Sequence, residues 1–134
     1  MRLIISTLLL LWVATIIAAP LMGTTALPIY AAFSWVCHQR PQRTWYVGVF
    51  PLAVCVRCFG IYVGALTAAV MGPRFSRRFW IGSMVLLASE WLLEAGGWSA
   101  LPSLVRFAAG LPAGFFSIPA LWGNTERLPS VIPG

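Results

Sequence analysis

The sequence predicts an all-α membrane protein with four transmembrane helices and a short interfacial helix. Of the 134 residues, 60% are hydrophobic and 9% are charged, whereas a soluble domain carries about 25% charged residues. The apolar residues are gathered into four segments near the length that crosses a bilayer, about 17–25 residues. We therefore expect a single transmembrane domain, residues 1–134, surrounded by a lipid bilayer.

The first apolar segment, about residues 3–19, is expected to be a retained helix. A cleaved signal peptide is the alternative, because Arg2 gives a basic start and Ala18–Ala19 are small. Pro20 follows this pair directly and argues against cleavage at that point.

The loop that follows, residues 20–51, contains an apolar stretch at 28–36 that is too short to cross a bilayer. Pro28 suits the first turn of a helix. Tyr30 and Trp35 carry amphipathic rings, which settle at the headgroup level. We therefore expect an interfacial helix at about 28–36.

Three further crossings are expected at about 52–72, 79–94 and 104–122. Pro112 and Pro119 lie inside the last of them and predict a kink, because proline removes a backbone hydrogen bond.

Arginines in the short loops predict the orientation. Arg74, Arg77 and Arg78 stand between the second and third crossings, and positive charge favours the cytoplasmic side. Both termini would then be cytoplasmic and the first loop would lie outside the cell, although that loop contains Arg40 and Arg43. We expect no nucleic-acid partner despite a net charge of +6, because the basic residues do not form a run.

A faint repeat links the second and fourth crossings. The stretches VRCFGIYVG and VRFAAGLPAG each begin with Val-Arg and each contain two glycines four residues apart. Gly60 and Gly64 share a helix face, as do Gly110 and Gly114, and small residues at this spacing let helix backbones approach closely. We expect helix packing through these glycines, which also permits assembly as a homo-oligomer.

Four charged residues are expected to meet near the outer end of the bundle. Arg57 and Arg106 precede the glycines of their helices, and Glu90 and Glu94 share one face of the third crossing. Charges in a bilayer normally pair or line a wet cavity. The predicted polar cluster is either functional or a purely structural clamp.

The three cysteines and the one histidine lie within a single stretch of 22 residues, from Cys37 to Cys58. Cys55 and Cys58 form a C-x-x-C at a predicted helix start, where the helix dipole favours thiolate. With Cys37 and His38 they offer three thiolates and one imidazole, a set that binds zinc. Thiolates also suit copper(I) or an iron–sulfur centre.

Other interpretations of these cysteines stay open. They are either buried structural residues or a redox pair. An outward-facing C-x-x-C among four helices resembles the quinone-linked thiol oxidases of the periplasm, which implies a quinone cofactor. Those oxidases use a second cysteine pair, and here only Cys37 remains.

The wider pattern, CHQRPQRTW followed by CVRCFGIYVG and VRFAAGLPAG, resembles the small prokaryotic membrane proteins called domain of unknown function 2085. The resemblance extends from about Cys37 to Gly114. It implies a multi-helix membrane protein with an outer-face Cys/His motif and an acidic residue in the third crossing, a place that Glu90 or Glu94 fills. It implies no activity.

The sequence thus favours a transition-metal site at Cys37, His38, Cys55 and Cys58, for structure or metal handling. Thiol–disulfide exchange is the second hypothesis. The third is an accessory subunit of a larger membrane complex, without chemistry of its own. No catalytic residue is assigned, because no phosphate-binding loop, nucleophile elbow or HExxH motif is present.

Overall fold

The computed structural model describes residues 2–72, 76–97 and 101–125, with side chains up to residue 119. The described chain is mostly helical, with a small hairpin in the first loop. In order, the elements are α1 (Arg2–Met22), η1 (Gly23–Ala26), α2 (Leu27–Ser34), η2 (Pro41–Arg43), β1 (Tyr46–Val47), β2 (Phe50–Pro51), α3 (Val56–Met71), α4 (Arg77–Ala95) and α5 (Ser103–Thr125).

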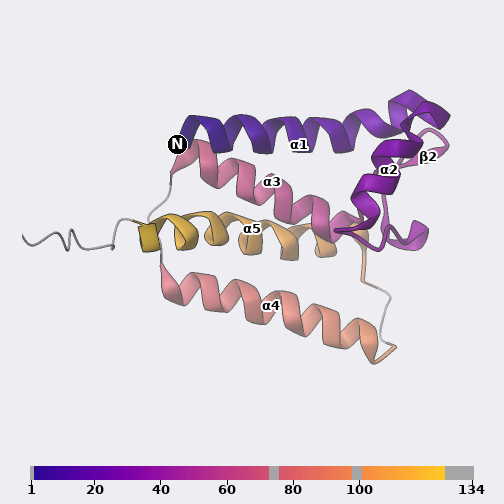
Figure 1. Cartoon of the computed structure of the whole chain (residues 1–134). Helices are drawn as coiled ribbons and strands as arrows, with labels where there is room; N and C mark the ends of the chain where they lie inside the picture. The colour runs from indigo at the N-terminus through magenta and orange to yellow at the C-terminus, as the bar shows by residue number, and fades with distance from the viewer. Residues whose placement is uncertain (1, 73–75, 98–100, 126–134) are drawn as a thin grey trace, which may run out of the picture.

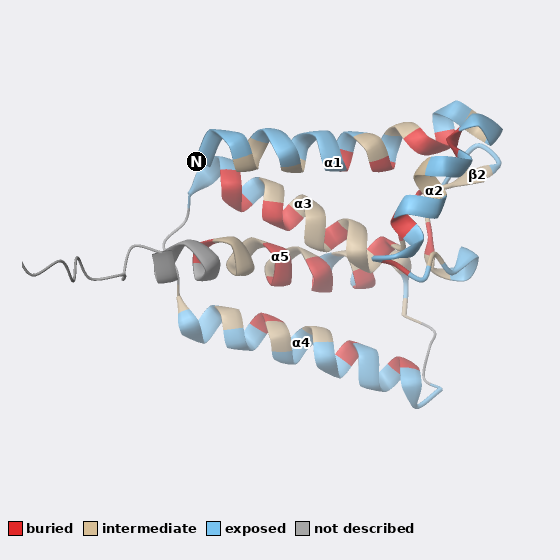
Figure 2. Ribbon diagram, viewed as in Figure 1, coloured by how far each residue is buried: buried red, intermediate tan, exposed pale blue. Residues whose placement is uncertain are grey.

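The long helices lie side by side in the order α1, α3, α5, α4 (Figure 1). The most extensive contact joins α3 to α5, and α4 packs mainly on α5. The segment from η1 to β2 folds over one end of this row. Figure 2 shows that buried residues face the middle of the row, whereas the outer sides of α1 and α4 are exposed.

Glycines allow α3 and α5 to touch through their backbones, as the repeat predicts. A Cβ atom built on Gly60 or Gly64 would collide with the carbonyl of Phe107 or Leu111. Likewise, a Cβ atom built on Gly110 or Gly114, in α5, would collide with backbone carbonyls of α3. Only glycine leaves room for this contact, so the two helices are held at a separation that their sequence fixes.

The far end of α3 is capped by the start of α1. Arg2 donates hydrogen bonds to the carbonyls of Ala69 and Val70, which have no partner within the helix. The cation also opposes the negative end of the helix dipole. Gly72 then ends α3 in the left-handed region, with φ +64°, a conformation that glycine adopts without strain.

The structure shifts the ends of several predicted helices. α1 continues through Pro20 to Met22, and the interfacial helix is Leu27–Ser34 rather than 28–36. The second predicted crossing begins too early, because residues 52–55 are not helical and Cys55 is the extended residue before α3. The sequence also gave no indication of the hairpin β1–β2. Arg74, on which the predicted orientation partly depends, lies outside the described residues.

By length and composition, one described helical stretch can cross a membrane. It is Arg2–Ser34, with a mean hydropathy of 2.3 in its most apolar window. α3 is apolar but has only 16 residues. α4 carries charges at both ends, with Arg77 and Arg78 at its start and Glu90 and Glu94 towards its end.

Candidate functional site

The three cysteines meet where the first loop crosses the start of α3. Cys37 follows α2, and its amide donates to the carbonyl of Phe33 at 2.9 Å, which fixes the turn that ends this helix. Cys55 precedes α3, and Cys58 lies in its first turn. The three sulfur atoms lie within 4.8 Å of one another. The cluster therefore joins Cys37 to two cysteines that lie 18 and 21 positions further along the chain.

Cys37 is the buried member of the cluster, and the other two thiols are partly exposed. Its sulfur accepts a hydrogen bond from the Cys55 amide at 3.2 Å. Hydrogen bonds from the side chains of Cys55 and Cys58 lower the pKa of the Cys37 thiol well below its usual range. The arrangement thus stabilises a thiolate at Cys37, the form that reacts with electrophiles and binds metals.

Gln39 holds the two cysteine-bearing segments together. Its side-chain nitrogen donates to the carbonyl of Tyr30, in α2, at 2.8 Å and to that of Ala53, just before Cys55, at 2.7 Å. Its backbone has φ +45°, a left-handed conformation that is uncommon for a residue other than glycine. Sequence reasoning gave Gln39 no role, because an amide with two remote carbonyl partners leaves no local signal.

His38 lies beside the thiol cluster without being part of it. It is exposed and lines the same cavity as the cysteines. However, its ring nitrogens are not among the ligand atoms that lie within 4.8 Å of one another, which come from Cys37, Cys55 and Cys58 alone. Adjacent residues generally point in different directions, and Cys37 is the one that points inward.

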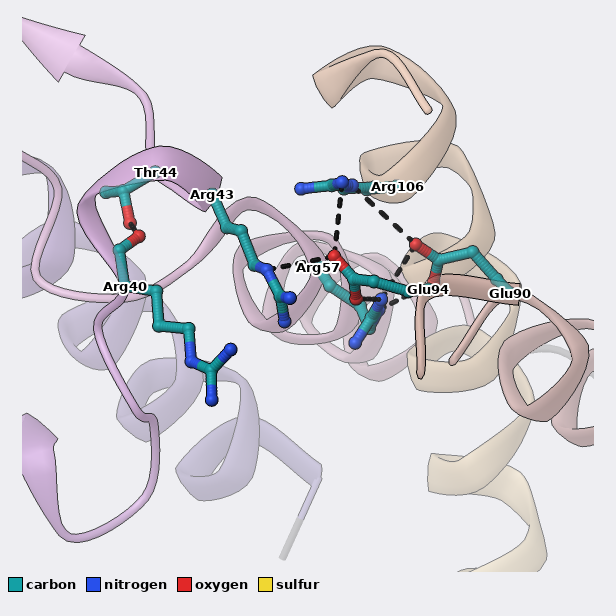
Figure 3. Close-up of polar contacts among 7 residues, drawn as sticks. All are labelled: Arg40, Arg43, Thr44, Arg57, Glu90, Glu94 and Arg106. Carbon is teal, nitrogen blue, oxygen red and sulfur yellow. Dashed lines mark hydrogen bonds and ion pairs between the residues drawn. The ribbon is translucent and has the colours of Figure 1, made fainter. Parts of the chain in front are cut away.

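The four residues of the predicted polar cluster do meet (Figure 3). Arg57 forms two hydrogen bonds with Glu90, at 2.6 and 2.8 Å, and a third with Glu94 at 2.9 Å. Arg106 forms an ion pair with Glu94 at 3.1 Å. Both carboxylates are buried. The cluster therefore ties α3, α4 and α5 together directly beside the cysteines.

Arg43 is a fifth member that the sequence did not reveal. It reaches from η2 to Glu94 at 2.9 Å (Figure 3). Its position in the first loop offered no hint of a partner, because the fold of that loop alone brings it to α4. The first loop is thus bonded to the same carboxylate as α3 and α5.

A cavity of about 380 Å³ opens between the thiols and the ion pairs. Its lining includes the three cysteines, His38, Gln39 and Trp91, together with four arginines, Arg40, Arg43, Arg57 and Arg106. Thiols and guanidinium groups therefore border one common space, and these groups are suited to a soft metal ion or an anion.

The chain belongs to the family described as predicted membrane protein (DUF2085), which matches residues 37–119. The match begins at Cys37 and includes Cys55, Cys58 and both carboxylates of the ion cluster. The predicted resemblance is thereby confirmed.

Two archaeal relatives are uncharacterized proteins. One, from Methanocaldococcus jannaschii, is 31% identical over 96 residues, which cover 65% of this chain and 62% of the relative. The other, from Methanothermobacter thermautotrophicus, is 29% identical over 89 residues, which cover 61% of this chain and 80% of the relative. The chain thus spans less than two thirds of the length of the first relative. No solved structure matches the chain.

Proposed function

We propose that this chain is a single transmembrane domain of four crossings, formed by α1, α3, α4 and α5. The composition of α4 supports this. Its buried residues are Ser83, Glu90 and Glu94, whereas Val85, Leu86 and Leu92 are exposed. A helix with its carboxylates inside and apolar side chains outside along its length suits lipid rather than water.

The proposed orientation places the cysteine cluster at the outer face, with Arg77 and Arg78 at the cytoplasmic end. These arginines and Arg2 lie at the opposite end of the row from the cluster (Figure 1). Basic residues concentrate on the cytoplasmic side of membrane proteins. After treatment of intact cells with a membrane-impermeant chelator to remove any bound metal, a membrane-impermeant maleimide should therefore label Cys55 and Cys58. Protection that persists with the chelator until the cells are opened would contradict the orientation.

The proposed function is transition-metal binding by Cys37, Cys55 and Cys58, for structure or metal handling. The proximity of the three sulfurs, within 4.8 Å of one another, carries this proposal. A Zn–S bond is about 2.3 Å, so two sulfurs on a tetrahedral ion are about 3.8 Å apart. Each pair of sulfurs, at 4.8 Å or less, is thus at most about 1 Å wider than this separation.

The donor set fits zinc or copper(I). Three thiolates form a trigonal site for copper(I), or three corners of a tetrahedral site for zinc. An iron centre is also compatible, although iron–sulfur clusters usually take four cysteine ligands, so a cluster here would need its fourth ligand from another source. His38 lines the same cavity, but its ring nitrogens are not among the grouped ligand atoms, so the three thiolates leave one position of a zinc ion open.

The ion cluster positions the thiols in this proposal. Arg57 lies between Cys55 and Cys58 in the sequence, and its guanidinium is held by Glu90 and Glu94. The first turn of α3 is therefore anchored to α4 on one side while it presents two thiols on the other. Removing such outer support of metal ligands commonly lowers metal affinity by roughly 10–100-fold.

Element analysis of the purified full-length chain tests the proposal. We expect about one zinc, copper or iron per chain, lost in C58S and retained in S89A, a surface variant on α4. A metal-free chain whose Cys55–Cys58 dithiol is oxidised to a disulfide while it reduces quinone to quinol would instead support thiol–disulfide exchange. A metal-free chain that co-purifies with a larger complex regardless of C58S would support an accessory role.

A further inference from the structure

The wall of the thiol cavity is cationic. All four arginines of the lining, Arg40, Arg43, Arg57 and Arg106, belong to it, whereas neither Glu90 nor Glu94 does. The carboxylates lie behind the guanidinium groups, where they bind Arg43, Arg57 and Arg106. The positive ends of these ion pairs therefore border the space in front of the sulfurs.

Arg40 adds a charge that no carboxylate balances among the described residues. Figure 3 shows its guanidinium apart from the ion cluster, with no interaction drawn to either glutamate. Three arginines already share the two glutamates. The four guanidinium groups and two carboxylates thus carry a net charge of +2 before the thiols and any metal are counted.

When three thiolates bind a divalent metal ion, the net charge of the groups around the cavity is +1. Four guanidiniums and the metal contribute six positive charges, against five negative charges from two carboxylates and three thiolates. Three thiolates also fill only three of the four positions that zinc prefers. His38 is not among the grouped ligand atoms, so one position faces the cationic cavity.

We propose that a small monovalent anion binds in this cavity as the fourth ligand of a divalent metal ion. Arg40 forms the part of the wall that faces the anion. This inference rests on the proposed metal site and adds the class of its second ligand. The cavity of about 380 Å³ is large enough for an anion of several atoms, and the exposed His38 and Arg40 border its opening. A copper(I) ion with three thiolates would leave no excess charge, so the anion is specific to divalent metals.

Cobalt(II) titration of the full-length chain in a zwitterionic detergent tests the proposal, with azide as the anion. Cobalt should produce a thiolate-to-metal charge-transfer band, and azide should then shift the visible ligand-field bands in a saturable way. The R40Q variant should bind cobalt normally but bind azide about tenfold more weakly, the effect of losing one charged hydrogen bond. R78Q is the control, because Arg78 lies at the start of α4, the end remote from Glu90 and Glu94. This variant should bind cobalt and azide like the wild type.

The outcomes separate the two proposals. No charge-transfer band would overturn the metal site and the anion site together. A normal charge-transfer band with ligand-field bands that do not respond to azide would overturn the anion site alone, as would equal azide affinity in R40Q and the wild type. Repeating the titration in nanodiscs identifies the source of the anion: if phosphatidylglycerol shifts the bands and competes with azide, the natural ligand is a lipid headgroup. If it does not compete, the ligand is a free anion.

Discussion

The contact between α3 and α5 gives the sharpest test of the fold. In G114A, the added Cβ would lie 2.7 Å from the carbonyl carbon of Ile61 and 2.9 Å from the amide nitrogen of Ala65. Carbon atoms in contact lie about 3.5–4.0 Å apart, so α5 must move away from α3 by about 1 Å. The opposing atoms are backbone and cannot rotate away.

The expected cost follows from that movement. Overpacking typically costs about 1–3 kcal/mol, and the higher helix propensity of alanine returns up to about 1 kcal/mol. We expect the free energy of unfolding to fall by about 1–2 kcal/mol, measured by titrating the protein in mild detergent with sodium dodecyl sulfate and following helicity. Arg57 and Arg106 lie on these two helices, so metal affinity should fall as well.

G82A is the matched control, because Gly82 is also inside a helix but a Cβ there would meet no atom within 4 Å. This variant should be as stable as the wild type, or slightly more stable. If G114A unfolds at the same detergent fraction as G82A, the close backbone contact between α3 and α5 is refuted.

Three further perturbations address the ion cluster and the thiols. E94Q removes the carboxylate that Arg43, Arg57 and Arg106 share. The same titration should show a loss of about 3 kcal/mol, because the buried Arg106 loses the charge of its partner. An unchanged midpoint would show that the cluster adds no stability. Q39E replaces the amide donor by an acceptor facing two carbonyls, so metal affinity should fall at least about tenfold while Q42E leaves it unchanged. Equal effects of the two glutamates would contradict the role of Gln39. Metal affinity should also be higher at about pH 8 than at about pH 6. The lowered pKa of Cys37 favours its thiolate at both pH values. The other two thiols must still lose protons before they bind the metal, and acid opposes that loss. Equal affinity at both pH values would count against thiolate ligation.

The sequence predicted the helical class and the close α3–α5 contact because both depend on local spacing. Two glycines four residues apart define a helix face wherever the helix lies. It also predicted that Arg57, Arg106, Glu90 and Glu94 meet, because buried charges must find partners. These inferences required only periodicity and the cost of an unpaired charge.

The first loop was harder to predict because its fold depends on remote contacts. Gln39 bonds to carbonyls on both sides of the loop, and Arg43 bonds to α4. Neither residue carries a repeating pattern. The same loop turns Cys37 inward and leaves His38 exposed, a choice that the adjacent pair could not reveal by spacing.

X-ray absorption at the metal edge of the purified, metal-loaded chain addresses the central claim most directly. A site formed by Cys37, Cys55 and Cys58 predicts three sulfur scatterers at about 2.3 Å from zinc, with at most one lighter atom completing the shell. A first shell of oxygen or nitrogen alone, in a chain whose three thiols all remain free to react with a maleimide, would contradict it.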